Sequence, residues 1–168
     1  MGLKTAFKVG DTIFYPSAGV GVIQATEDLY IDGRREPCYV IHIHQNRVTI
    51  KVPRTNLAKN GIRRPLDGKK AKDVFKVLSS GGARRATGGN WAERCKDLER
   101  RINTGSCLEL AAAVRDLVHW KKKSGLSFEE ARLLATASGY LSDELAAVQG
   151  IPSETAYDHI QRHIGARA

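Results

Sequence analysis

The first third of the chain, residues 7–54, alternates polar and apolar side chains with the period of two that predicts β-strands. The clearest runs are residues 39–44 and 47–52, in which every second residue is Tyr, Ile or Val. Asp32-Gly33 is a strong signal for a two-residue hairpin, and Gln45-Asn46 is a weaker turn candidate. About four or five short strands in this length predict a small twisted sheet or an SH3- or Tudor-like barrel.

Two glycines interrupt the first of these β segments. Gly19 and Gly21 lie two residues apart. Glycine inside a strand pattern often marks a tight bend or a bulge. We therefore expect one of these features near Gly19 and Gly21.

After about residue 66 the apolar residues recur at the three- and four-residue spacing of amphipathic helices. The stripes are Ala71, Val74, Phe75 and Leu78; Trp91, Cys95, Leu98 and Ile102; Leu110, Val114, Leu117 and Val118; Leu134, Leu141, Leu145 and Val148; and Ala156, Ile160 and Ile164. Asn90 is a good N-cap, and Ser106 and Ser127 are each followed three residues later by Glu, as in a capping box. Lys121–Lys123 close the third segment, where they favour the negative end of a helix dipole. The pattern predicts an all-α bundle of about five helices.

The change of period divides the chain into two predicted domains, residues 1–66 and residues 67–168. The fold class is therefore α+β, a small twisted β-sheet or SH3- or Tudor-like barrel followed by a helical bundle. A hydrophobic content of 42% over 168 residues is enough for a folded core.

The positive charge is concentrated in one quarter of the sequence. Residues 63–101 contain twelve Lys or Arg and five Asp or Glu, an excess of seven out of a net charge of +9. This concentration favours a polyanionic partner, with an ordinary solvated basic surface as the alternative. Charge alone does not separate DNA from RNA or from an acidic protein face.

Asn90-Trp91 opens a predicted helix at the end of this basic region, and the sequence before it is rich in glycine and includes Arg84 and Arg85. Arg94 and Lys96 follow along the same helix. Cations hold phosphates, and an apolar wedge can unstack a base step at a cost of about a few kcal/mol. Because Trp91 is in phase with the apolar stripe of its helix, a core position is the alternative interpretation.

Motifs of enzymes and metal sites are missing from the sequence. It contains no G-x-S-x-G, Walker loop, H-E-x-x-H or C-x-x-C. His42 and His44 share a strand face, and His159 and His163 have a chelating spacing on a helix, but nearby residues do not complete a site. We therefore expect surface histidines, a protein that is not an enzyme, and no cofactor or metal.

The three cysteines, at positions 38, 95 and 107, are widely spaced and odd in number, which indicates a reducing compartment. The N-terminus lacks the apolar segment of a signal peptide, and no segment approaches the length of a membrane span. The expectation is a soluble, cytoplasmic protein without a membrane partner, and a monomer by default.

Motifs in both halves of the chain resemble the CarD/CdnL family of bacterial transcription regulators. They are Phe7–Asp11, Tyr15-Pro16, Gly19–Gly21, Val52-Pro53, Val74–Leu78, Asn90-Trp91, Val114–Leu117 and Leu126–Glu130, in that order along nearly the whole chain. The resemblance implies a Tudor-like N-terminal module that binds the β subunit of RNA polymerase. It also implies a helical C-terminal domain that contacts promoter DNA.

Within this resemblance, Trp91 matches the tryptophan that wedges into the minor groove at the upstream edge of the melted bubble. Arg94 and Lys96 match residues that contact the DNA backbone, and Asn90, Arg84 and Arg85 complete the expected DNA-binding set. The expected polymerase-binding set is Lys51, Arg47 and Leu29. Leu29 and Glu93 each stand where the family has a basic residue, and Cys95 stands where it has an aromatic one.

The expected function is therefore a non-enzymatic regulator that binds RNA polymerase and double-stranded promoter DNA at the fork junction and stabilises the open complex. One alternative is a divergent CarD-like paralog, an adaptor that binds polymerase or another protein and makes little contact with DNA. The other is a free-standing RNA- or peptide-binding Tudor-like module. The aromatic cage expected for that module is not evident, because Tyr15, Tyr30 and Tyr39 are dispersed along the β segment.

Overall fold

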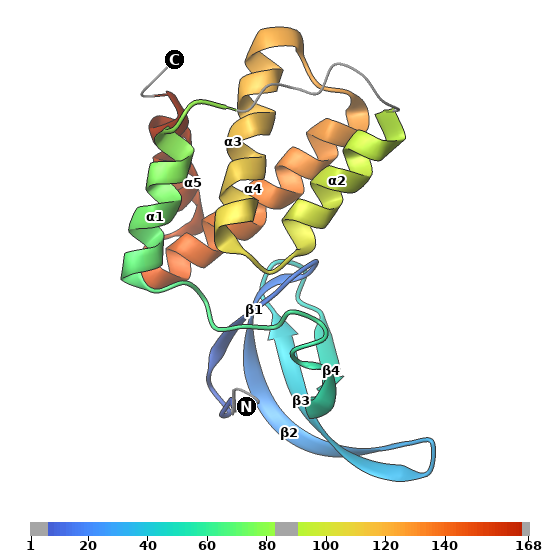
Figure 1. Ribbon diagram of the computed structural model, residues 1–168. Coiled ribbons are helices and arrows are strands. Elements are labelled where there is room, and N and C mark those ends of the chain that lie inside the picture. The colour runs from blue at the N-terminus through green and yellow to red at the C-terminus, as the bar shows by residue number, and fades with distance from the viewer. Residues whose placement is uncertain (1–6, 83–90, 166–168) are drawn as a thin grey trace. The chain divides into compact units, whose positions relative to one another are not determined.

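The structure, a computed structural model, describes residues 7–82 and 91–165 of the chain. The chain divides into two compact units, Met1–Pro65 and Leu66–Ala168. Within the described residues, the first unit holds the strands and the second holds the five α-helices (Figure 1). The α+β class predicted from the change of period is confirmed.

A four-stranded antiparallel sheet forms the first unit, in the order β1-β2-β3-β4. The strands are β1 (Thr12–Tyr15), β2 (Gly19–Ile31), β3 (Arg34–Ile43) and β4 (Thr49–Pro53), followed by the 3-10 turn η1 (Arg54–Asn56). The sheet is curled into a half-barrel (Figure 1), as the SH3- or Tudor-like prediction requires. The outer parts of β2 and β3 continue as a long two-stranded ribbon whose residues are mostly exposed.

The β2–β3 hairpin turns at Asp32-Gly33, as predicted, because Ile31 pairs with Arg34. Both turn residues have positive φ, 49° at Asp32 and 75° at Gly33, which is the backbone that this dipeptide favours. The tight bend expected near Gly19 and Gly21 is present, and a bulge lies farther along β2. A tight turn joins Tyr15 to Gly19, and the register shift lies between Ile23 and Ala25.

The predicted extent of the last strand is wrong at Arg47. β4 begins at Thr49, whereas Arg47 lies in the turn before it with φ of 55°. The two-residue periodicity begins at residue 47, but a left-handed backbone is incompatible with an extended strand. Val48, which the alternation assigned to the apolar face, is 44% exposed.

The concave side of the sheet encloses a core of its own. Its buried residues come from every strand of the sheet and from the segments on either side: Phe7, Ile13, Ile23, Tyr39, Ile41, Ile43, Val52, Leu57 and Ile62. The Tyr39 hydroxyl donates to the Phe7 carbonyl at 2.9 Å, which satisfies the polar tip of a buried ring. The first unit therefore has a hydrophobic core built entirely from its own residues.

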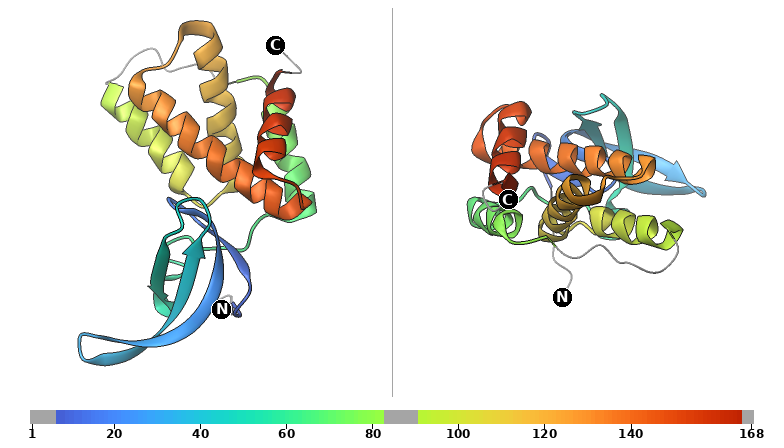
Figure 2. Two further views of the ribbon diagram at one scale, coloured as in Figure 1. Left: turned by 180° about the vertical axis from the view of Figure 1, so that it is seen from behind. Right: turned by 90° about the horizontal axis from the view of Figure 1, so that it is seen from above.

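Five helices lie in the described part of the second unit (Figure 2), as predicted. They are α1 (Gly68–Ser79), α2 (Trp91–Asn103), α3 (Cys107–Ser124), α4 (Phe128–Gln149) and α5 (Ser153–Gly165). α4 is the longest, and α2, α3 and α5 all pack against it. None of the helices in the described ranges has the length and apolar character needed to cross a membrane.

Serine caps begin α3 and α4, as the sequence predicts. Ser106 Oγ accepts from the Glu109 amide at 3.3 Å, and Ser127 Oγ accepts from the Glu130 amide at 3.2 Å. At α4 the capping box is complete, because Glu130 also accepts from the Ser127 amide at 2.9 Å.

Most of the predicted apolar stripes are buried, although Phe75, Leu134 and Val148 are only half-buried. The larger departure is Trp91. It shares the phase of Cys95, Leu98 and Ile102, which are 7%, 2% and 3% exposed, but is itself 48% exposed. Helical side chains point back toward the N-terminus, so the ring of a first helical residue projects beyond its own helix.

Candidate functional site

The start of α2 presents Trp91 at the surface of the second unit. Cys95, Leu98 and Ile102 hold the helix against α3 and α4 by burying its apolar side. The half-exposed Trp91 therefore sits on a fixed helix.

The orientation of the indole is held by the neighbouring helix. Trp91 Nε1 donates to Ser127 Oγ at 3.2 Å, and Ser127 is also the N-cap of α4. One hydroxyl thus joins the first turns of α2 and α4. An aromatic ring that is polar at one edge and accessible elsewhere is suited to stacking on a planar ligand.

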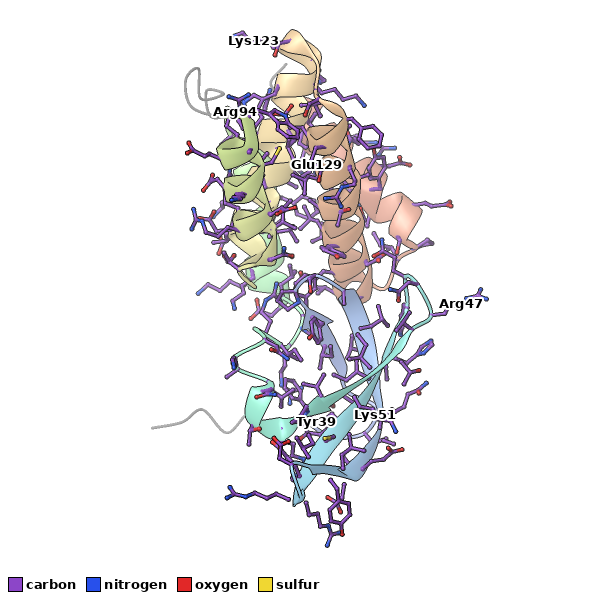
Figure 3. All side chains as sticks on the ribbon, turned by 90° about the vertical axis from the view of Figure 1, so that its right-hand side faces the viewer. Tyr39, Arg47, Lys51, Arg94, Lys123 and Glu129 are labelled. Atoms are coloured by element: carbon purple, nitrogen blue, oxygen red, sulfur yellow. The ribbon has the colours of Figure 1, made fainter. Side chains whose placement is uncertain are left out.

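Arg94 and Lys96 lie at different distances around the helix from Trp91. At about 100° per residue, Arg94 is about 60° from Trp91 and Lys96 is about 140° away. Arg94, labelled in Figure 3, lies in the first part of α2. Arg94 is half-buried and Lys96 is exposed. The structure therefore brings Trp91 and Arg94 to one side of α2 and places Lys96 toward the opposite side. The predicted DNA-binding residues Asn90, Arg84 and Arg85 lie outside the described residues.

Acidic residues accompany the cations on the outer face of α2. Asp97 pairs with Arg100 at 2.6 Å, and Glu99 pairs with Arg132 of α4 at 3.6 Å. Glu93 is exposed in the first turn. The positive charge predicted for this helix is therefore partly compensated locally.

Sequence reasoning did not assign Phe128 or the lysines of α3 to this end of the bundle. Phe128, the first residue of α4, is 87% exposed and adjoins Ser127. Lys121–Lys123 are exposed in the last turn of α3, shortly before it. Phe128 is out of phase with Leu141 and Leu145 of its helix, and this phase was the available signal for its exposure.

The cysteine on α2 has low reactivity. Cys95 is buried, and burial, followed by the nearby carboxylate of Glu130, raises the pKa of its thiol. A raised pKa keeps the thiol protonated at neutral pH and lowers its nucleophilicity. Cys95 therefore serves packing, as the apolar stripe predicts.

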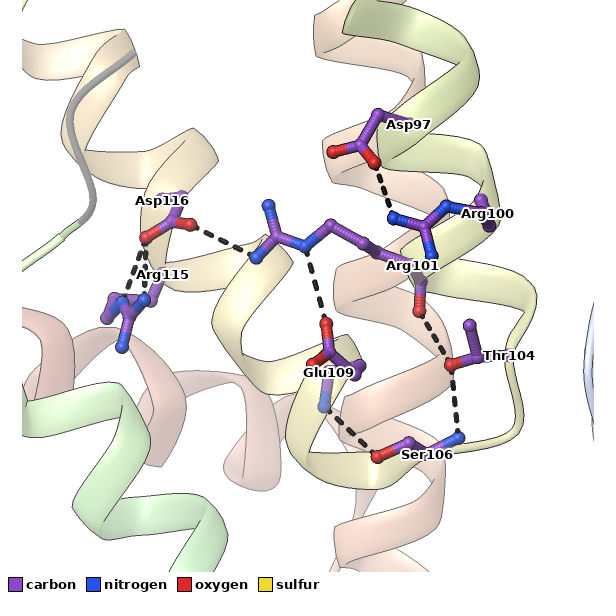
Figure 4. Close-up of polar contacts among 8 residues, drawn as sticks. All are labelled: Asp97, Arg100, Arg101, Thr104, Ser106, Glu109, Arg115 and Asp116. Carbon is purple, nitrogen blue, oxygen red and sulfur yellow. Dashed lines mark hydrogen bonds and ion pairs between the residues drawn. The ribbon is translucent and has the colours of Figure 1, made fainter. Parts of the chain in front are cut away.

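The other end of α2 is fixed by a buried ionic cluster (Figure 4). Asp116 of α3, 1% exposed, accepts from Arg101 of α2 at 3.1 Å and from Arg115 Nε at 3.0 Å. Arg115 also donates to Ser80 Oγ at 2.7 Å and to the Val77 carbonyl at 3.3 Å, at the end of α1. The cluster joins three helices and holds α2 in a defined position.

On the sheet, the predicted polymerase-binding residues occupy different settings (Figure 3). Lys51 is exposed on β4 and pairs with Glu27 of β2 at 2.8 Å. Leu29 is two residues beyond Glu27 on the same strand, so the two side chains share a face. The structure brings Lys51 and Leu29 to one face, whereas Arg47 is exposed in the preceding turn.

The histidine pairs have ordinary contacts. The His42 and His44 rings are 6.3 Å apart, and His163 Nδ1 lies 2.8 Å from the His159 carbonyl. His163 also stacks on Phe75 of α1, with ring centroids 4.3 Å apart. Over residues 7–82 and 91–165 no group of three or more His, Cys, Asp or Glu side chains is arranged to hold a metal ion.

Two domain families match the chain in the order of its two units. The model of the "CarD-like/TRCF RID domain" matches residues 7–66, and that of the "CarD, C-terminal domain" matches residues 73–161. "Putative transcription factor YdeB" of Bacillus subtilis (strain 168) is 31% identical over 145 residues, which cover 86% of this chain and 94% of that protein. The solved structure of "CdnLNt" from Myxococcus xanthus is 33% identical, covers 38% of this chain and 90% of its own, and has a TM-score of 0.31.

Proposed function

This chain belongs to the CarD/CdnL family of transcription factors, and we propose that it binds the β subunit of RNA polymerase through its sheet and promoter DNA through its helical unit. At the promoter it contacts the minor groove at the upstream edge of the bubble and stabilises the open complex. The proposal assigns polymerase binding to residues 1–66 and DNA binding to residues 67–168.

The accessibility of Trp91 is the observation that carries the proposal. The ring is 48% exposed, and the Ser127 hydroxyl binds its Nε1 edge. A preoriented ring loses little conformational entropy when a base stacks on it. Half-buried Arg94, on the same side of α2, would contact a phosphate beside that base.

The sheet contributes the attachment to polymerase. Lys51 is exposed, and its pair with Glu27 lies at the surface, with side chains 47% and 45% exposed. Surface pairs of this kind contribute only ~0.2–1 kcal/mol, so a carboxylate on a partner competes readily for Lys51. The adjacent Leu29 supplies an apolar contact where other family members supply a charge.

Attachment to polymerase raises the local concentration of the helical unit at the promoter. The phosphate contacts hold it there without regard to sequence. Trp91 then stacks at the fork and opposes reannealing. Because a ligand shifts an equilibrium only through its differential interaction with the two states, the effect requires that Trp91 contact the melted form better than the closed duplex.

The test is the lifetime of the open complex with the Trp91→Ala variant. We expect the protein-dependent gain in lifetime to fall by about tenfold, because base–aromatic stacking contributes ~1–3 kcal/mol. Polymerase binding should be unchanged. The lifetime is measured by competitor challenge of complexes formed on a fluorescent promoter.

Leu108→Ala is the matched control, since Leu108 is an apolar side chain on α3 with a similar exposure of 41%. It should retain the wild-type lifetime. A Trp91→Ala protein that extends the lifetime as well as the wild type does would reject the wedge.

A second candidate is an adaptor that binds polymerase and recruits another protein. The ion pairs of Asp97 and Glu99 favour it, because they reduce the positive charge of α2. Crosslinking of a photoreactive residue at position 91 to promoter DNA discriminates the two, since the adaptor predicts no crosslink.

A further inference from the structure

A groove of about 700 Å³ lies on the second unit, apart from the indole of Trp91. Its walls come from the end of α3, the first half of α4 and α5. The residues that line it are Lys121, Gly125, Leu126, Ala131, Leu134, Ala135, Ser138, Gly139 and Tyr157. This volume is within the range of about 300–1,000 Å³ that is usual for small-molecule sites.

Small side chains on one side of α4 give the groove its depth. Ala131, Ala135 and Gly139 follow one another at four-residue spacing, so they stack along the same helix face. Leu126 and Leu134 extend the apolar lining, and the ring of Tyr157, 44% exposed, closes one side. The floor is thus apolar over about 12 Å of helix, the rise from residue 131 to residue 139.

The charge at the groove has one sign. Among the described residues that line it, Lys121 is the one charged side chain. Lys122 and Lys123 follow it, all three are exposed, and no carboxylate belongs to the lining. An apolar trough with a cation at its margin complements a ligand with an apolar chain and an anionic head.

We propose that this groove binds an anionic amphiphile, with an unbranched chain of medium length lying along Ala131, Ala135 and Gly139 and a carboxylate head at Lys121. The chain length follows from the floor, because about ten methylenes extend over ~12 Å. A cationic amphiphile finds no carboxylate among the described lining residues, and its head is repelled by Lys121. The site is separate from the proposed wedge, so it stands whether or not Trp91 acts on DNA.

The test is calorimetric titration of the full-length protein with sodium dodecanoate, kept well below its micelle concentration. Butyrate has the same head without the chain, and dodecyltrimethylammonium has the same chain with a cationic head. We expect dodecanoate alone to bind with a measurable saturable isotherm.

Two variants locate the site. Ala135→Leu fills the floor and should weaken dodecanoate binding by about tenfold or more, since each methylene excluded from an apolar contact costs about fourfold. Lys121→Gln should weaken it by about two- to fivefold, as expected for an exposed ion pair. Ala147→Leu, at an exposed alanine of the same helix, and Lys122→Gln, at the next lysine, are the matched controls and should bind as wild type.

Circular dichroism of each variant confirms that the helices are intact. The proposal fails if dodecanoate does not bind, if Ala135→Leu binds it as well as Ala147→Leu does, or if the ammonium amphiphile binds as tightly. If dodecanoate does not bind but an acidic amphipathic peptide does, and Ala135→Leu weakens binding of that peptide, the groove would instead be the binding site for a helix of a partner protein.

Discussion

At the scale of single residues, the Ser127 hydroxyl has two functions at once. It accepts from the Glu130 amide, which caps α4, and from Trp91 Nε1, which orients the indole. Ser106 is a cap of the same kind on α3, where it accepts from the Glu109 amide. The pair offers a way to separate capping from orientation.

Replacing either serine by alanine should lower the free energy of unfolding by about 1 kcal/mol, the usual contribution of an N-cap. Ser127→Ala should in addition shift the emission of Trp91 to longer wavelength, because the indole N–H exchanges serine for water. The measurements are urea unfolding and fluorescence in a Trp120→Phe background, which leaves Trp91 as the sole tryptophan.

Ser106→Ala should destabilise the protein without an emission shift. If Ser127→Ala leaves the emission unchanged while reducing stability, the Trp91–Ser127 bond does not hold the ring in solution.

The exposure of Trp91 shows how far helical phase alone can predict burial. Phase placed Trp91 on the apolar stripe, but its position in the first turn directs the ring beyond the helix. Phase also indicated the exposure of Phe128, which was not recognised as part of the same surface. Its proximity to Trp91 depends on the contact between the starts of two helices that are far apart in sequence.

At the scale of elements, the cluster around Asp116 holds α2 against α3 (Figure 4), and Arg115 extends it to the end of α1. Arg115 and Arg101 are 14% and 17% exposed in their side chains, so the three charges are largely removed from water. Breaking such a cluster on one side leaves charges buried without a partner. That loss is much larger than the loss of a surface ion pair.

Asp116→Asn should therefore lower the free energy of unfolding by about 3 kcal/mol, measured by urea denaturation. The control is Asp73→Asn, which removes the surface pair between Asp73 and Lys76 at 3.6 Å and should cost no more than about 1 kcal/mol. Equal effects of the two substitutions would contradict the structural role of the cluster.

Elements with strong local signals were predicted well. Asp32-Gly33 determines its own turn through positive φ, and Ser127 and Glu130 determine the start of α4 by bonding each other. The bend expected near Gly19 and Gly21 is confirmed by the tight turn between Tyr15 and Gly19. The register shift between Ile23 and Ala25 was not predicted, because a bulge depends on pairing with a distant strand and not on the local residues. Arg47 was misassigned for a related reason, since the alternation of side chains already begins at residue 47, before the strand begins at Thr49.

At the scale of the whole molecule, the chain consists of two units that each bury a core. The sheet unit closes around residues such as Ile41 and Val52, and the helical unit around residues such as Leu117 and Leu141. A unit with its own core can fold alone. The division also suits the proposed function, in which one unit binds polymerase and the other binds DNA.

We expect fragments 1–66 and 67–168 to fold separately, with cooperative thermal unfolding followed by circular dichroism. Fragment 1–66 should retain binding to an isolated polymerase β fragment in a pull-down, and Lys51→Glu should weaken that binding. Fragment 67–168 should retain salt-dependent binding to promoter DNA, with lower affinity than the full chain because the attachment to polymerase is lost.

Aggregation or non-cooperative unfolding of either fragment would contradict the independence of the units. DNA binding that remains only in fragment 1–66 would contradict the assignment of their functions.

The linear chain was sufficient to establish the two periodicities, the order of strands and helices, the caps, the Asp32-Gly33 turn and the family resemblance, because each of these depends on residues close together in sequence. Only the tertiary structure showed that Trp91 is half-exposed and hydrogen-bonded to Ser127, and that Lys51 pairs with Glu27. It also showed that α3, α4 and α5 leave an apolar groove beside Lys121. These features arise where elements distant in sequence meet, and the accessibility of a side chain is a property of its neighbours in space rather than of its neighbours along the chain.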